Sequence, residues 1–100
     1  MGEHVEIEIT PYCIRNGLKE SCEHCPIALA IYLAFEPKSI DVNSTTAKWK
    51  DNDFAYECDL PTSARNFISA FDQGLYVFPF TLHGDVRKSK LHTPEEEQNG

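Results

Sequence analysis

The feature that most constrains this chain is an uninterrupted run of nine apolar residues, 27–35, directly after Pro26. Proline is accepted at the first position of a helix, and Glu36 followed by Pro37 ends the pattern. A helix that is apolar on all sides must lie at the centre of a core or be covered by a partner. The run is under half of the roughly 20 residues that a membrane span needs, so we expect no membrane insertion.

Alternating apolar and polar residues predict strands elsewhere in the chain. The pattern covers residues 5–9, 40–43, 47–50 and 54–58, and the Asp-Asn-Asp cluster at 51–53 predicts the turn before the last of these. A further alternation joins Phe78, Phe80 and Leu82. Because Pro79 has no N–H to donate, this segment is predicted to be an edge strand or to contain a strand start.

Capping residues and periodicity predict two more helices. Thr10 is a natural N-cap before Pro11, and Gly17 is placed where a left-handed residue would end a short helix over 11–16. A longer helix starts within the stretch 59–62, and Gly74 ends it. Its apolar residues follow the spacing of one helix face: Ala64, Phe67, Ile68 and Phe71.

The resulting order of elements is β-α-α-β-β-β-α-β, in which strands and helices do not strictly alternate. Such an order predicts an α+β fold with a small, mainly antiparallel sheet and helices on one face. We expect residues 1–84 to form this single globular domain, since 100 residues suffice for one core. Residues 85–100 contain few apolar side chains and no period, which predicts a disordered C-terminal tail.

The charge balance narrows the classes of partner. Sixteen acidic and nine basic residues give a net charge of −7. This charge repels phosphate backbones and anionic lipids, so we expect no nucleic acid and no membrane, and a basic protein surface is the better partner. The alternative, which we favour for the charge taken alone, is that the acidic surplus only keeps a small domain soluble. No secretory signal is visible and the cysteine content is below that of a disulfide scaffold, so we expect a cytoplasmic chain with reduced thiols.

Cys22 and Cys25 form a Cys-x-x-Cys motif at the start of the apolar helix, and three chemistries fit this spacing. We favour packed thiols that seat two small side chains at the helix entrance. A structural zinc site would use Cys22 and Cys25 with Cys13 or His24, and its fourth ligand is unknown. Thiol-redox chemistry is the weakest alternative, because acidic neighbours raise a thiol pKa. Candidates for the fourth zinc ligand are Cys58, His4 and His83.

The other chemistry-bearing residues do not predict an enzyme. The four histidines are scattered without a serine or acidic partner at a recognisable spacing, so we assign no catalytic residue. A base-stacking platform would need a basic groove, which the sequence lacks. We therefore expect the aromatic rings at alternating positions to belong to the core: Trp49, Phe54, Tyr56, Tyr76, Phe78 and Phe80.

Several blocks of the chain resemble small uncharacterised proteins of tailed bacteriophages. The most specific is Cys-Glu-His-Cys-Pro-Ile-Ala-Leu-Ala at 22–30, accompanied by 7–17, by 59–74 and by Pro-Phe-Thr-Leu at 79–82. Those proteins often carry a histidine where this chain has Cys13, which would suit a metal-ligand position. The resemblance implies a phage origin and the host cytoplasm, and it implies no particular reaction.

Together these observations predict a small, acidic, non-enzymatic accessory protein that binds and modulates a host or phage protein. We expect it to need no cofactor. The alternatives are a zinc-stabilised module and a thiol-redox protein, as set out for Cys22, Cys25 and Cys13.

Overall fold

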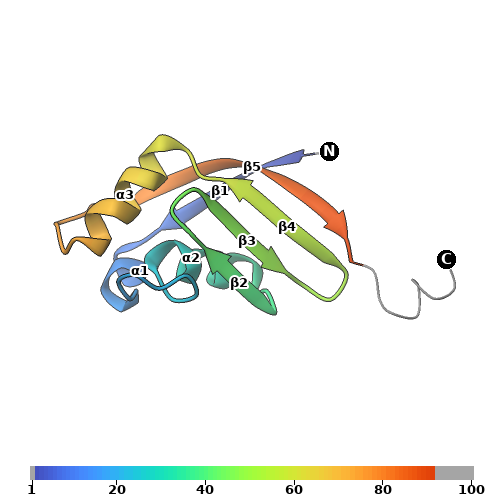
Figure 1. Ribbon diagram of the computed structural model, residues 1–100, viewed down its shortest axis with the longest axis horizontal. Helices are drawn as coiled ribbons and strands as arrows, with labels where there is room; N and C mark the ends of the chain where they lie inside the picture. The colour runs from blue at the N-terminus through green and yellow to red at the C-terminus, as the bar shows by residue number, and fades with distance from the viewer. Residues whose placement is uncertain (1, 92–100) are drawn as a thin grey trace, which may run out of the picture.

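The computed structural model describes residues 2–91 and has the predicted α+β class and order of elements (Figure 1). All of its strands join one antiparallel sheet, in the order β1-β5-β4-β3-β2. The elements are β1 (Gly2–Ile9), α1 (Pro11–Asn16), α2 (Pro26–Phe35), β2 (Ser39–Val42), β3 (Thr46–Lys50), β4 (Phe54–Asp59), α3 (Thr62–Asp72) and β5 (Phe80–Lys90).

The sheet has one buried and one exposed face because its strands alternate in the predicted way. On β1, Ile7 and Ile9 are buried while Glu6 and Glu8 are exposed. On β3, Trp49 is buried between exposed lysines. We call the buried side the inner face and the opposite side the outer face. Helix α2 contacts both edge strands, β1 and β2, and so reaches across the sheet.

Helix α2 has the predicted bounds, but only its first half is central to the core. Ile27 and Ile31 are fully buried, whereas Leu33 and Phe35 are 57% and 44% exposed. The helix therefore enters at the core and leaves it after two turns. It is also too short to cross a membrane, as is every other helix between residues 2 and 91.

The predicted disordered tail over 85–100 is wrong for residues 85–90, which continue β5 between β1 and β4. Val86 is buried on the inner face, and Gly84 occupies the inward position before it. A Cβ on Gly84 would lie 2.5 Å from the Cys58 sulfur, so this site requires glycine. The glycine interrupts the alternation of apolar residues, so the hydrophobicity pattern does not predict that the strand continues. Residues 92–100 of the predicted tail lie outside the described residues.

Of two predictions about element ends, one is confirmed and one needs correction. Strand β5 begins directly after Pro79, which confirms the strand-start alternative, and β5 is an internal strand. Gly17 is extended (φ −74°, ψ 151°) and not left-handed. A Cβ on Gly17 would lie 2.6 Å from the Pro26 ring, so close packing explains this glycine. Gly74 follows the end of α3, as predicted, and is left-handed at φ 79°.

Candidate functional site

The four thiols occupy different environments. Cys13 and Cys58 are each 1% exposed, Cys25 is 5% exposed, and Cys22 is exposed. Cys25 is the N-cap of α2, because its sulfur accepts a hydrogen bond from the Ala28 N–H at 3.4 Å. The Cys13 sulfur accepts a hydrogen bond from the Thr10 hydroxyl at 3.3 Å. Thus Cys25 and Cys13 serve the packing of α2 and α1.

The structure does not bring Cys22, Cys25 and Cys13 together as a set of metal ligands. Within residues 2–91, the one group of three potential ligand atoms that lie within 4.8 Å of one another contains no cysteine. Burial raises the pKa of the Cys25 thiol, and desolvation followed by a hydrogen bond with Asp41 raises that of Cys22. Raised thiol pKa values oppose thiolate nucleophiles at these two positions.

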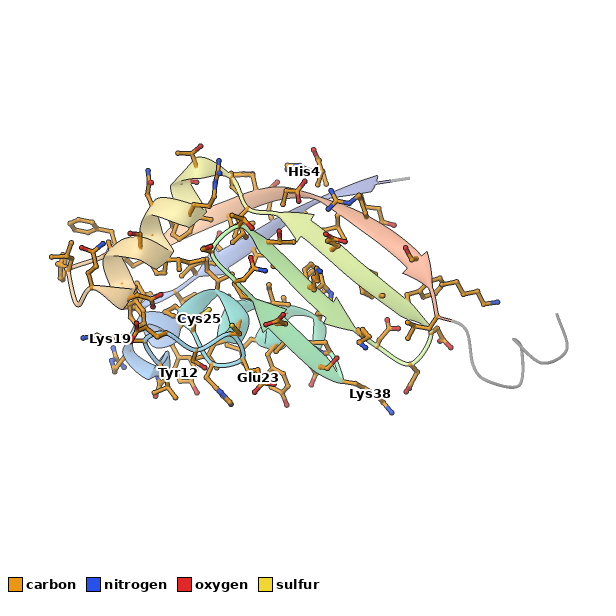
Figure 2. The ribbon with its side chains drawn as sticks, viewed as in Figure 1. His4, Tyr12, Lys19, Glu23, Cys25 and Lys38 are labelled. Atoms are coloured by element: carbon orange, nitrogen blue, oxygen red, sulfur yellow. The ribbon has the colours of Figure 1, made fainter. Side chains whose placement is uncertain are left out.

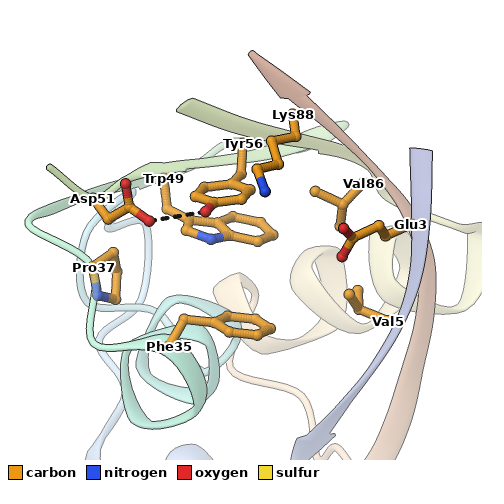
Figure 3. A pocket seen from close by; sticks show the side chains of 9 residues that line it. All are labelled: Glu3, Val5, Phe35, Pro37, Trp49, Asp51, Tyr56, Val86 and Lys88. Atoms are coloured by element: carbon orange, nitrogen blue, oxygen red, sulfur yellow. Dashed lines mark hydrogen bonds between the residues drawn. The ribbon is translucent and has the colours of Figure 1, made fainter. Parts of the chain in front are cut away.

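A cleft opens on the inner face where α2 ends (Figure 3). Its wall is a stack of three nearly parallel rings. Phe35 and Trp49 have ring centroids 5.5 Å apart, and Trp49 and Tyr56 have centroids 5.7 Å apart. Val5 and Val86 face the stack from β1 and β5. Glu3, Asp51 and Lys88 supply the charged groups at its rim.

Asp51 holds one end of the stack in place. Its carboxylate accepts hydrogen bonds from the backbone N–H groups of Asp53 and Phe54 and from the Tyr56 hydroxyl, the last at 2.8 Å. These bonds, in that order of importance, lower the pKa of Asp51. Desolvation and the bond to Asp51 raise the pKa of Tyr56. The groups therefore form a stable turn, with Asp51 charged and Tyr56 neutral at physiological pH.

The cleft is small. It measures about 230 Å³, below the roughly 300–1,000 Å³ of pockets that enclose small molecules. Trp49 is only 4% exposed, so its ring belongs to the core, as predicted. The cleft is best described as the open end of the hydrophobic core.

The most exposed apolar side chains lie between α3 and β5. We call residues 75–78, with the sequence Leu-Tyr-Val-Phe, the 75–78 loop. Leu75, Tyr76 and Phe78 are 58%, 82% and 68% exposed. The prediction that Tyr76 and Phe78 belong to the core is therefore wrong, whereas Val77 between them packs against the core. A hollow beside the loop, of about 300 Å³, is lined also by Ile14 of α1, Phe71 of α3 and Lys19.

The start of the loop is anchored to the end of α3. The Gly74 N–H donates to the Phe71 carbonyl at 3.0 Å, and the Leu75 N–H donates to the Ala70 carbonyl at 2.9 Å. Tyr76 and Phe78 form an edge-to-face pair with centroids 4.8 Å apart. The loop thus leaves the helix through a hydrogen-bonded turn, and its two exposed aromatic rings contact each other.

No protein-family model, curated protein or solved structure matches this chain.

Proposed function

We propose that this chain is a small, non-enzymatic accessory protein that binds a partner protein through the 75–78 loop and modulates it. The observation that carries the proposal is the exposure of Leu75, Tyr76 and Phe78, three large apolar side chains within four residues. Covering apolar surface releases about 25 cal/mol for each Å² removed from water, so such a cluster favours association.

The composition and order of the loop suit a binding surface. Tyrosine is enriched among residues that dominate binding energy, and aromatic residues concentrate in the buried centre of interfaces. Because Gly74 and the helix-end hydrogen bonds anchor the start of the loop, binding would order fewer backbone bonds than it would in an unanchored segment. The hollow beside Ile14 and Phe71 would accept an apolar side chain of the partner.

Net charge supports a partner with basic residues around its apolar contact. The chain carries a charge of −7, which would accelerate association with a positive surface and would do so less at high salt. Lys19 at the hollow is a local positive exception, so we expect an acidic residue of the partner near it. The phage resemblance makes a bacterial host protein or a phage protein the expected class of partner, and the host cytoplasm the place of action.

The experiment is capture from bacterial lysate by the immobilised full chain at low and high salt. Three baits are compared: the wild type, the double variant Tyr76→Ser/Phe78→Ser, and the control Tyr32→Ser/Leu33→Ser. The control removes two apolar side chains of α2 that are 52% and 57% exposed, in a different element from the loop. We expect a protein captured by wild type and control to be lost from the loop variant, with weaker capture at high salt.

Enrichment that is equal with all three baits would show that the loop is not the binding surface. A lysate from which no protein is enriched at either salt concentration would contradict the accessory role. Circular dichroism of each bait checks that loss of capture does not reflect loss of folding.

A further inference from the structure

A second surface, on the outer face, brings together three side chains that bind metals in other proteins. His4 and Glu6 on β1 and His83 on β5 place one potential ligand atom each within 4.8 Å of the others. Glu6 lies opposite His83 in the strand register, and His4 lies opposite Asp85. All four side chains therefore occupy neighbouring positions on one face of an antiparallel pair.

The strand ladder fixes this arrangement. Strands β1 and β5 pair from Gly2 opposite Arg87 to Ile9 opposite Phe80, so the four residues lie well inside the ladder. The imidazoles of His4 and His83 stack along the diagonal, with centroids 5.7 Å apart and an interplanar angle of 23°. Figure 2 shows His4 on the side of β1 and β5, far from Cys25 among the helices.

Asp85 supports the orientation of His4. Its carboxylate lies 3.4 Å from Nδ1 of His4. Histidines that bind metals usually hold one ring nitrogen against a carboxylate or carbonyl, which leaves the other nitrogen for the ion. Asp85 therefore stands where an orienting carboxylate is needed, and it adds negative charge beside the group.

Several acidic side chains near Glu6 already have a hydrogen-bond or ion-pair partner. Glu8 accepts a hydrogen bond from Thr81 at 2.8 Å, and Arg87 forms ion pairs with Glu57 and Asp59. Across the described chain, Glu6 has no such pairing. The Glu6 carboxylate thus remains available beside two imidazoles, each of which offers a ring nitrogen as a ligand atom when it is neutral.

We propose that His4, Glu6 and His83 form a binding site for a divalent first-row transition ion such as Zn²⁺, with Asp85 orienting His4. Imidazole nitrogen and carboxylate oxygen suit zinc, cobalt and nickel, whereas Mg²⁺ and Ca²⁺ prefer oxygen alone. Tetrahedral bonds of about 2.0–2.1 Å bring ligand atoms to about 3.4 Å from one another. Small rotations of these exposed side chains would bring their ligand atoms from within 4.8 Å to this separation. Three protein ligands leave a coordination position open to solvent.

In the experiment, a chelator first removes bound metals from the full chain and is then removed itself. Zn²⁺ is titrated into the chain, and calorimetry measures the affinity and the number of ions bound. We expect one ion per chain, and we expect Glu6→Gln and His83→Ala each to weaken binding about tenfold or more. The matched controls are His24→Ala, another exposed imidazole, and Cys22→Ser, the exposed thiol. Both should bind as the wild type does. Mg²⁺ in excess should not displace the Zn²⁺.

Co²⁺ gives a second readout that separates this site from the thiols. Coordination by His4, Glu6 and His83 should produce visible absorption without the near-ultraviolet band of cobalt bound to thiolate. A thiolate band, or binding that Cys22→Ser abolishes, would overturn the proposal, as would absence of binding at millimolar Zn²⁺. Equal affinity of the wild type, Glu6→Gln and His83→Ala would do so too. Because all three ligands are exposed, the variants should keep the fold, which circular dichroism checks.

Discussion

The inner and outer faces of the sheet differ in what their residues can do. On the inner face, Ile7, Leu82 and Val86 pack beneath the helices and are nearly inaccessible to solvent. On the outer face, their sequence neighbours are polar or charged, and several form ion pairs or hydrogen bonds, such as those of Arg87 with Asp59. The alternation of β-strands thus places residues for stability and residues for chemistry next to each other in the sequence.

The largest expected effect comes from a deletion that removes residues of both faces at once. Truncation after Gly84 deletes the half of β5 that pairs with β4 and removes Val86 from the core. Domains of this size are stable by only about 5–15 kcal/mol, so we expect loss of the cooperative thermal transition. Circular dichroism during heating measures this. A truncated chain that melts like the full chain would mean that 85–90 behave as the tail that the sequence predicts.

Within α2, the comparison predicts opposite results for two similar side chains. Ile31→Ala removes packed methyl groups from a residue that is 1% exposed, so it should cost about 2–5 kcal/mol. Leu33→Ala changes a residue that is 57% exposed and should cost about 0.5 kcal/mol or less. Urea unfolding gives both values from the midpoints at unchanged slope. Equal midpoints for the two variants would contradict the division of this helix into buried and exposed halves.

Adjacent residues of β5 test the two faces directly. Val86→Ala should lower the free energy of unfolding by about 1–3 kcal/mol, because it removes two buried methyl groups and leaves a cavity. Arg87→Ala removes ion pairs with Asp59 and Glu57 that lie in solvent. Its effect should be smaller and should fade as salt is added. A larger loss from Arg87→Ala at high salt would reverse the roles assigned to the faces.

The smallest expected effect is a change in stability at acidic pH. Hydrogen bonds lower the pKa of Asp51, and Arg87 lowers that of Asp59, both from an ordinary value near 3.8. A depressed carboxyl pKa stabilises the fold above the unfolded-state pKa, and this contribution disappears as pH falls through the lower folded-state pKa. Asp51→Asn should therefore destabilise the chain near pH 7 and differ less from the wild type at about pH 3. Melting temperatures at both pH values measure this, and a gap that widens in acid would refute it.

Local sequence patterns predicted most of the fold because the signals were local. Pro11 and Pro26 mark helix starts, and Gly74 marks a left-handed helix end. The Asp51 turn follows from the ability of its side chain to accept backbone hydrogen bonds. Such features depend on a few consecutive residues, so they can be predicted without knowledge of the tertiary contacts.

The candidate sites could not be predicted in the same way. The Cys-x-x-Cys spacing suggested a site, yet Cys25 is an N-cap and Cys22 faces solvent. The outer-face group joins His4 to His83, which are separated by 78 intervening residues, and no periodicity of the sequence indicates such a pairing. The exposure of Tyr76 depends on where the chain between α3 and β5 turns.

The sequence by itself determined the α+β class, the order of elements and most of their boundaries, because capping, proline geometry and alternation act over a few residues. The tertiary structure decided that 85–90 are an internal strand, since only β1 and β4 supply the partners for their backbone groups. It also decided which apolar side chains are exposed and which histidines meet. These outcomes depend on strand register and packing between distant segments, which local propensity does not encode.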